Sequence, residues 1–322
     1  MFRERASLLH QNRRVRVAIV HDYLTQRGGA ERVVLSMLKA FPDAPLYTSV
    51  YEPSGTFPEF ADVDVRTSPL NAIAPLRRDP RRAIGLLAPT FSRMRVDADV
   101  TFCSSSGWAH GCATTGVKVV YCHNPARWLY QADDYLGEQP RRAARLALAL
   151  LRSRLMRWDR AAAATAAVYL TQSRVVQGRI ETAYGRKAEL LPAPVGLDEG
   201  GSRTPVNGVA AGYFLCVSRL QPYKNVGAVV DAFRGLDQDL VVVGDGPERA
   251  RLEEQLPPNV TLLGAVTDEH LRWLYANCTG VVAASYEDYG LTPLEALRFG
   301  RPSAVLRYGG FLDTVCEGET GV

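Results

Sequence analysis

The sequence has few cysteines, no long apolar run and little net charge, and each of these absences excludes a class of protein. Six cysteines are scattered with none in C-x-x-C spacing, so we expect buried, reduced thiols and no zinc or disulfide framework (Cys103, Cys112, Cys122, Cys216, Cys278 and Cys316). No apolar run is long enough to span a bilayer. The net charge of +4 does not by itself indicate a nucleic-acid partner, and we expect none. The basic first residues are followed by no apolar segment, so we expect no signal peptide and a cytoplasmic protein.

The 322 residues are long for one hydrophobic core, so two domains are expected. Short β-branched runs alternate with longer helical patterns, which predicts parallel sheets covered by helices. Expected strands are 15–21, 46–51, 100–103, 118–122, 168–171 and 189–191, then 213–217, 240–243, 260–263, 281–284 and 303–306. Helices are expected at 30–41 and 175–184 in the first half. The prediction is an α/β protein with two Rossmann-like domains that face each other across a cleft.

Proline and glycine mark the domain boundary. Residues 192–212 contain eight of them, which neither a helix nor a strand tolerates. We therefore expect a flexible basic N-terminus at 1–14, an acceptor-side domain at 15–195, a linker at 196–210 and a nucleotide-sugar domain at 211–322. Open parallel sheets bind ligands beyond the carboxyl ends of their strands, and most of the motifs described next follow a predicted strand.

The segment from Glu287 to Glu295 carries the most specific motif. It places two carboxylates eight positions apart, on either side of Gly290, Leu291, Thr292 and a proline that can open a helix. A helix beginning at Pro293 would put Glu295 in its first turn and offer unpaired amides to a phosphate. The carboxylates would suit hydroxyls on either side of that phosphate, which describes a nucleotide-sugar. A favourable charge at a helix start beside a solvated carboxylate is the alternative.

Two further motifs follow strands of the second half. Arg219 and Lys224 flank a turn that contains a proline, and both side chains bind phosphate oxygens well. Gly244 and Gly246 follow the next strand, where they permit a sharp turn and close approach of a ligand. Surface cations and a purely structural turn are the respective alternatives. Gly309-Gly310-Phe311 follows the last strand and could meet a sugar hydroxyl.

The first half has its own candidates. Gly28 and Gly29 stand at a helix entrance, where backbone amides could meet a phosphate or sugar. His123 follows a strand and could bind a sugar hydroxyl or transfer a proton, unless it is a structural histidine. Asp97-Ala98-Asp99 has the D-x-D form of a metal motif but precedes its strand, so two solvated carboxylates are the better interpretation. We expect no metal and no other cofactor.

Together these motifs resemble glycosyltransferase family 4, whose members are retaining enzymes of the GT-B fold. The resemblance is strong over 213–322 and weaker over 139–205. It implies that Arg219 and Lys224 grip the donor diphosphate, Glu287 contacts the transferred sugar and Glu295 contacts the ribose. It also implies that amides near Leu291 and Thr292 meet the phosphate, and that His123 lies near the reacting centre. Family members usually continue past the position of Val322, so we expect a truncated second domain or a different closure.

The resemblance implies a hexosyltransferase that moves a sugar from a nucleotide donor, for which GDP-mannose is the first guess, to a glycan or a lipid-linked acceptor of polysaccharide synthesis. A nucleotide-sugar epimerase and a phosphorylase remain alternatives among enzymes, although no lysine context supports pyridoxal phosphate. A catalytically silent sugar-nucleotide-binding protein is an alternative from another class.

A basic amphipathic stretch could add a membrane surface. Residues 141–160 carry seven arginines and one acid, with Leu148, Leu151, Leu155 and Trp158 at helical spacing. Nearby in sequence are further arginines (Arg77, Arg78, Arg81, Arg82, Arg93 and Arg95). Such a stretch can lie on the anionic inner face of the cell membrane, and an ordinary helix with a solvated basic face is the alternative.

Overall fold

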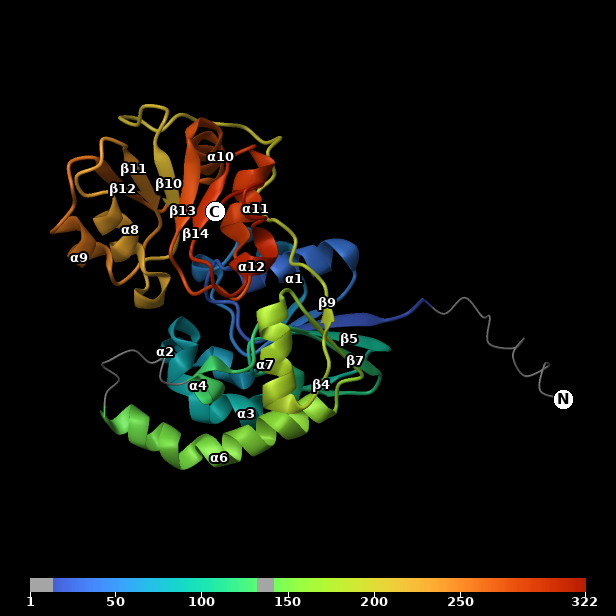
Figure 1. The fold of residues 1–322 in the computed structure, drawn as a ribbon. Coiled ribbons are helices and arrows are strands. Elements are labelled where there is room, and N and C mark those ends of the chain that lie inside the picture. Colours follow the sequence, from blue (N-terminus) through green and yellow to red (C-terminus); the bar gives the residue numbers. More distant parts are fainter. Residues whose placement is uncertain (1–13, 132–141) are drawn as a thin grey trace. The chain divides into compact units, whose positions relative to one another are not determined.

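The computed structural model describes residues 14–131 and 142–322, with the side chains of 142–150 and of Arg81 left out of the description. The basic residues 1–13, expected to be flexible, lie outside the described part. The chain divides into two compact units, Met1–Cys122 with Ala149–Leu170 and His123–Leu148 with Thr171–Val322. It carries one sheet of seven strands and one of five, in which every pairing with a defined register is parallel (Figure 1). The predicted α/β class with two parallel sheets is confirmed.

The seven-stranded sheet has the order β3-β2-β1-β5-β7-β8-β9. Its strands are β1 (Val17–His21), β2 (Leu46–Thr48), β3 (Val65–Thr67), β5 (Val100–Ser105), β7 (Val117–Cys122), β8 (Val168–Thr171) and β9 (Glu189–Leu190). A separate pair joins β4 (Arg95–Val96) to β6 (Ala113–Thr114). The α-helices that accompany these strands are α1 (Gly29–Ala40), α2 (Ala74–Arg78), α3 (Ile84–Arg93), α4 (Arg127–Tyr130), α6 (Arg142–Ala164) and α7 (Arg174–Tyr184).

A core of aliphatic side chains holds α1 on this sheet. Ile19 of β1, Leu46 of β2 and Val34 of α1 are completely buried in one cluster. Since central parallel strands are covered on both faces, their apolar residues need not alternate with polar ones. The near-continuous apolar run of β1 therefore fits the centre of the sheet, and its carboxyl end leads directly into the loop before α1.

The five-stranded sheet has the order β12-β11-β10-β13-β14. Its strands are β10 (Phe214–Val217), β11 (Leu240–Val243), β12 (Val260–Gly264), β13 (Gly280–Ala283) and β14 (Ser303–Val305). The α-helices between and after them are α8 (Val226–Ala232), α9 (Arg249–Glu253), α10 (Asp268–Asn277), α11 (Leu291–Arg298) and α12 (Phe311–Thr314). β10 lies at the centre, so the loop that follows it opens at the middle of the sheet's carboxyl edge.

Alternation along the strands divides the core of this sheet into two layers. Val241 packs in one layer with Leu274 of α10, and Val242 packs in the other with Val229 of α8. Successive strand residues point to opposite faces, so one apolar strand can serve both layers. The carboxyl edge between the two layers of helices is thus held by a core on each face.

The structure also departs from the sequence prediction in places. The strand expected at 46–51 stops at Thr48, and β3 was not predicted because it has only three residues, two of which are Arg66 and Thr67. Residues 192–212 form no helix or strand, as their prolines and glycines predicted, yet Leu197 among them is 1% exposed and packs in the core of the second sheet. Cys316 is exposed, so the prediction of buried thiols is wrong at that position.

Within 14–131 and 142–322, no helix combines the length and the apolar character that crossing a bilayer requires.

Candidate functional site

The loop after β10 places a lysine beside the first glutamate of the acidic motif. A short 3-10 turn, Pro222–Lys224, begins with proline and ends at Asn225, whose φ of 54° is left-handed. This turn brings the Lys224 ammonium within 2.5 Å of Glu287 Oε1. Both side chains are largely buried, at 13% and 22% exposed. The basic and acidic segments, 63 residues apart in sequence, therefore meet at one edge of the five-stranded sheet.

The surroundings of Glu287 favour its ionised form. Burial alone would raise the pKa of this carboxyl, but the charge and hydrogen bond of Lys224 lower it more. The Ser285 hydroxyl donates a further hydrogen bond of 2.9 Å, and the charge of Arg127 acts in the same direction. Glu287 is thus a hydrogen-bond acceptor at neutral pH, which suits a ligand hydroxyl.

Tyr223 contacts three cations, Arg219 and Lys224 of its own loop and Arg127 of α4. Arg219 is exposed and donates from Nη2 to the Tyr223 hydroxyl at 3.0 Å. The Lys224 ammonium lies 5.1 Å from the centre of the Tyr223 ring, and the Arg127 guanidinium carbon lies 5.7 Å from it. Cations at these distances are attracted by the face of an aromatic ring. Two positive charges therefore lie over the Tyr223 ring and a third on its hydroxyl, and such a group of cations suits a diphosphate.

The helix of the acidic motif begins earlier than predicted. α11 starts at Leu291, with Gly290 as its N-cap at a φ of 85°, so Pro293 is the third helical residue. Its missing N–H is still one of the unpaired groups of the first turn, which explains why proline is tolerated there. Glu295 is consequently the fifth residue, outside the first turn. Its carboxylate is 9% exposed and accepts a 2.7 Å hydrogen bond from the Tyr275 hydroxyl.

Gly244 and Gly246 are required by the backbone. Their φ angles are 139° and 157°, which side chains rarely adopt. A Cβ on Gly244 would lie 1.8 Å from the Ser218 carbonyl oxygen, and one on Gly246 would lie 2.4 Å from that of Leu220. These glycines let the loop after β11 lie directly against the Arg219 loop. Their structural role is established by this geometry, and contact with a donor stays a prediction.

Gly309 and Gly310 support the Glu287 loop in the same way. A Cβ on Gly309 would lie 2.3 Å from the Glu287 carbonyl oxygen, and one on Gly310 would lie 2.2 Å from the Tyr289 Cα. The Gly310 amide donates to the Glu287 carbonyl at 2.9 Å. Gly309 and Gly310 therefore pack directly against the backbone of the acidic motif and hold it in place.

Asp288 and its partners were not predicted from the sequence. Within the second compact unit, the Asp288 carboxylate forms ion pairs with Arg127 and with Arg179, the latter at 2.5 Å. The Asn124 amide donates to the same carboxylate at 3.0 Å, and the Ser173 hydroxyl donates to the Asp288 carbonyl. Two signals could have found them, because Asn124 and Arg127 adjoin His123 and Asp288 adjoins Glu287.

His123 follows β7, as predicted. Its backbone carbonyl accepts a 2.7 Å hydrogen bond from the Gln172 amide, which ties the ends of β7 and β8 together. The proposed contact of its ring with a sugar stays a prediction.

The glycine pair of the first unit makes room for a buried carboxylate. Gly28 is the N-cap of α1, and a Cβ there would lie 2.7 Å from Glu31 Oε2. Glu31 is 1% exposed, accepts from the Gln26 amide at 3.1 Å and lies 3.6 Å from His21 Nε2. Burial alone would lower the pKa of His21, but the hydrogen bond and charge of Glu31 raise it overall. Gly29 is the first residue of the helix, and donor binding by either glycine stays a prediction.

The D-x-D segment has a structural partner. The Arg16 guanidinium pairs with Asp97 at 3.0 Å and with Asp99 at 3.2 Å, both at the amino end of β5. Among residues 14–131 and 142–322, no three His, Cys, Asp or Glu side chains are grouped so that they could hold a metal ion.

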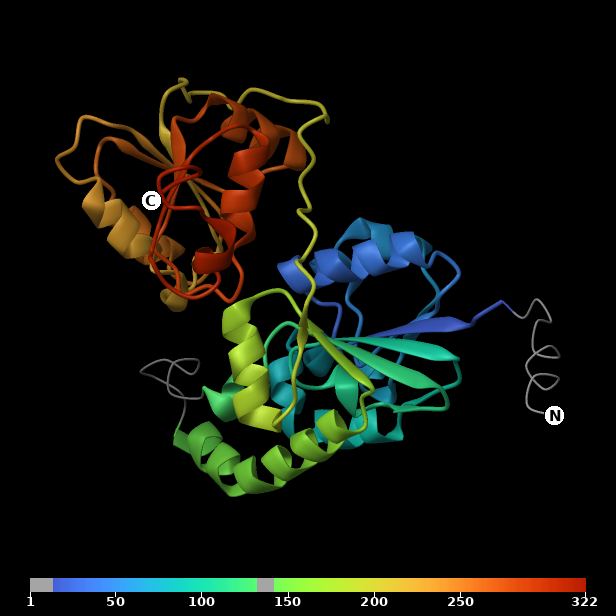
Figure 2. The same cartoon turned by 45° about the vertical axis from the view of Figure 1, so that its right-hand side comes forward.

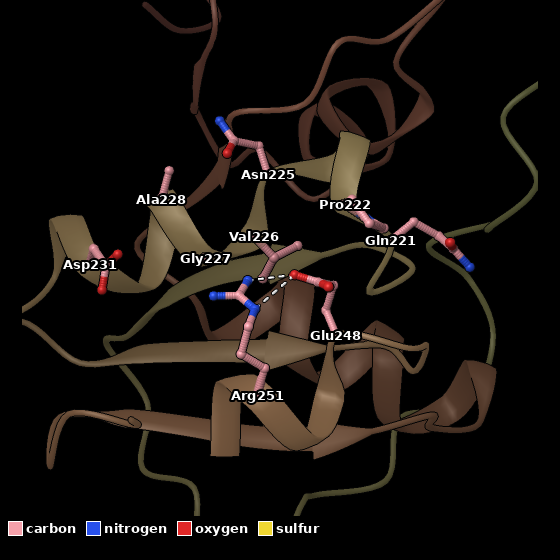
Figure 3. A pocket seen from close by; sticks show the side chains of 9 residues that line it. All are labelled: Gln221, Pro222, Asn225, Val226, Gly227, Ala228, Asp231, Glu248 and Arg251. Carbon is pink, nitrogen blue, oxygen red and sulfur yellow. Dashed lines mark hydrogen bonds and ion pairs between the residues drawn. The ribbon is translucent and has the colours of Figure 1, made fainter. Parts of the chain in front are cut away.

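A pocket of about 300 Å³ lies beside the Lys224 turn (Figure 3). The start of α8 forms one wall, and Glu248 and Arg251, paired at 2.5 Å, form another. Figure 3 shows the Arg251 guanidinium turned toward the Glu248 carboxylate below Val226. Neither Lys224 nor Glu287 lines it, so this pocket is distinct from the candidate site.

The last part of the chain is similar in sequence to known glycosyltransferases. Residues 209–322 match the family model described as glycosyl transferases group 1. The alpha-1,3/1,6-mannosyltransferase ALG2 of Dictyostelium discoideum is 27% identical over 137 residues, 34% of this chain and 33% of that protein. A GDP-mannose-dependent alpha-mannosyltransferase of Corynebacterium glutamicum is 34% identical over 107 residues, 33% of this chain and 26% of that protein. The matched segments thus span a third or less of the length of these relatives.

The fold has solved counterparts over nearly the whole chain. The Anabaena protein HepE, solved in complex with UDP-glucose, aligns with a TM-score of 0.67 and 20% identity over 96% of this chain and 85% of that one. At this identity the likeness concerns the fold alone. It shows the GT-B fold of these neighbours, and the segment matched by the family model, 209–322, includes Arg219, Lys224, Glu287 and Glu295.

Proposed function

We propose that this chain is a retaining hexosyltransferase of glycosyltransferase family 4, acting in the cytoplasm. It transfers a sugar from a nucleoside-diphosphate donor to a glycan or a lipid-linked acceptor of polysaccharide synthesis. The observation that carries the proposal is the meeting of Lys224 and Glu287 at 2.5 Å, with Arg219 in the loop of Lys224 and the start of α11 four residues after Glu287. Cations beside a helix N-terminus suit the diphosphate, and a desolvated carboxylate suits a sugar hydroxyl.

The donor would lie with its diphosphate between Arg219, Lys224 and the first amides of α11. As the bond from the sugar to the diphosphate breaks, negative charge grows on the leaving oxygen, and these groups stabilise it without reorganising. Amides at Leu291 and Thr292 face no helical acceptor of their own, so they are free to donate to phosphate oxygens. Glu295, held by Tyr275, would orient the ribose.

Retention would follow from front-face attack. The acceptor hydroxyl approaches the anomeric carbon from the side of the departing diphosphate, which takes the hydroxyl proton as the new glycosidic bond forms. Glu287 would orient the transferred sugar, and its pairing with Lys224 disfavours use as a free nucleophile. His123 would bind a sugar hydroxyl near the reacting carbon.

The names of the relatives favour a GDP-mannose donor. Both curated relatives described above are mannosyltransferases, and one is named for its dependence on GDP-mannose. The structural neighbour was solved with UDP-glucose, a ligand of the same chemical class. Since Arg219 and Lys224 supply the positive charge at the diphosphate, we expect transfer without a metal ion.

The test compares donor binding with donor turnover. Thermal unfolding is measured with GDP, UDP, GDP-mannose and UDP-glucose, since a ligand that binds the folded form at a hundredfold its Kd adds about 2.7 kcal/mol of stability. Turnover is then followed with and without acceptor glycans, and with EDTA present. Stabilisation with transfer supports the proposal. Binding without transfer would favour a silent sugar-nucleotide-binding protein, isomerisation of the donor sugar would favour an epimerase, and no binding would refute the site.

A further inference from the structure

A groove of about 520 Å³ runs between α3 and α6 in the first compact unit, far in sequence from the candidate donor site. The two helices lie next to each other in both views of the fold (Figures 1 and 2). Besides Arg93, α3 contributes residues 85, 88, 89 and 92, and α6 contributes 151, 154, 155 and 158. Each set has the i, i+3, i+4, i+7 spacing of a single helix face, so two complete faces oppose each other.

The groove exists because the two faces do not fill the space between them. α3 presents small side chains, among them Gly85 and Ala88, to the larger Leu151, Leu155 and Trp158 of α6. A Cβ on Gly85 would only just touch Leu151, with 3.9 Å to its Cδ1. In a protein core, the side chains of two facing helices normally interdigitate until their packing density equals that of an organic crystal. The volume falls in the range of small-molecule sites.

The floor of the groove is held in place. The Trp158 indole N–H donates to the Ser92 hydroxyl at 2.8 Å, which ties α6 to α3 at one end. The ring rests on Gly111, where a Cβ would lie 2.3 Å from Trp158 Cζ2, and it lies 5.8 Å from the Trp108 ring centre. Because the indole is fixed on both sides, it cannot swing in to close the groove.

Positive charge lines the rim. Arg93 and Arg154 are both exposed groove residues, and neither forms an ion pair with any carboxylate in the part of the chain that the structure describes. Exposed apolar side chains adjoin them, with Leu86 49% and Leu151 36% exposed. An apolar channel with cations at its mouth complements a molecule that has an alkyl chain and an anionic head.

The rest of α6 extends this charge. Arg152, Arg157 and Arg160 are exposed, whereas the nearest acid, Asp159, is fully buried and lies 3.0 Å from His110 Nε2. The helix from 151 to 160 therefore presents arginines to the solvent with no exposed carboxylate among them. This charge favours an anionic bilayer over a neutral one or a basic protein partner.

We propose that the α3–α6 groove binds an acyl chain of an anionic membrane lipid, with the lipid phosphate between Arg93 and Arg154. The groove would hold the first unit on the bilayer surface, and it acts independently of the donor site. The apolar face of α6 then has a specific ligand, the acyl chain. A basic helix without the groove would give only nonspecific electrostatic attraction to an anionic surface.

The test uses flotation with phosphatidylcholine vesicles, with and without phosphatidylglycerol. Gly85→Phe fills the groove and leaves the charge unchanged, and Ser153→Phe adds the same side chain to an exposed position of α6 outside the groove. Gly85→Phe should weaken binding to the anionic vesicles at least tenfold. Each methylene of the acyl chain that is excluded from the groove lowers the affinity about fourfold. Ser153→Phe should retain binding. Equal binding by the two variants would overturn the proposal.

A second pair of variants tests the position of the phosphate. Arg93→Ala with Arg154→Ala should weaken binding more than Arg95→Ala with Arg157→Ala, which removes the same charge from exposed positions outside the groove. Replacing the outer pair should weaken vesicle binding about fivefold per arginine, because only the general attraction to the anionic surface is lost. Equal losses of binding by the two double variants would refute the position of the phosphate between Arg93 and Arg154. Equal binding to neutral and anionic vesicles would refute the anionic headgroup. Donor-induced thermal stabilisation, measured on every variant, reports separately on the proposed transferase site.

Discussion

Replacing Lys224 with alanine removes the cation that both pairs with Glu287 and faces the proposed diphosphate. A preorganised charge at a leaving group is worth about 3–4 kcal/mol in the transition state. Converted to rate, this is roughly a hundredfold to a thousandfold loss of turnover. The 2.5 Å approach to Glu287 and the 13% exposure of the lysine indicate the upper part of that range, because little water can take its place.

The same substitution also leaves Glu287 without its cation. Breaking a buried pair costs about 3–5 kcal/mol, and we expect the lower end because the Glu287 side chain is 22% exposed and can regain water. Turnover must therefore be measured below the unfolding temperature of the variant, with donor binding followed by calorimetry. Lys187→Ala, at an exposed position of the same unit, is the matched control and should change neither quantity.

A double variant separates the two effects. Lys224→Ala with Glu287→Gln removes the orphaned charge, so it should recover most of the lost stability and none of the lost turnover. Near-normal transfer by Lys224→Ala would remove this lysine from the mechanism. Recovery of turnover in the double variant would show that the lysine acts only by neutralising Glu287.

Three further outcomes follow from the same edge of the sheet. Gly244→Ala should cost about 2–6 kcal/mol in chemical denaturation, since it combines a positive φ with a clash against the Ser218 carbonyl; an unchanged midpoint would contradict this geometry. Asp288→Asn should lower the free energy of unfolding by about 3 kcal/mol, as two arginines lose their acid, and equal stability would refute the pairing. The pKa of Glu287 in the folded protein lies below its ordinary value of 4.5, so the stability that its ionised form adds is complete above pH 4.5. This stability is lost as the pH falls through the pKa of the folded protein. Denaturation curves of the Lys224→Ala variant should lack this loss at acid pH.

Much of the fold could be predicted from the sequence because its strands are apolar and its loops contain glycine. The run Leu240–Val243 appears with the predicted bounds, since four successive buried aliphatic residues between turn residues suit only a central parallel strand. β3 was missed because an edge strand of three residues has too little pattern to detect. The start of α11 was misplaced because proline fits any position of a first turn, and Gly290, whose left-handed φ begins the helix, gave no distinct signal.

Some residues of the candidate site could likewise be predicted from the sequence, and others could not. Lys224 and Glu287 could be named because each follows a strand of one sheet, and strand ends meet at one edge. Asp288 adjoins Glu287 and so could have been singled out, but its ion pairs with Arg127 and Arg179 could not, because these arginines lie more than 100 residues away in sequence. Spacing within a motif is visible in sequence, and partners from distant helices are not.

The contact of Gly309 and Gly310 with the backbone of Glu287 and Tyr289 has a consequence for motion. At these two glycines no side chain separates the backbones of the two loops, so a shift of one backbone by a fraction of an ångström must be matched by the other. The two loops should therefore respond as one rigid body. A fluorine label on Tyr308, whose ring centre lies 5.2 Å from that of Tyr286, should change its resonance whenever a donor sugar reaches Glu287.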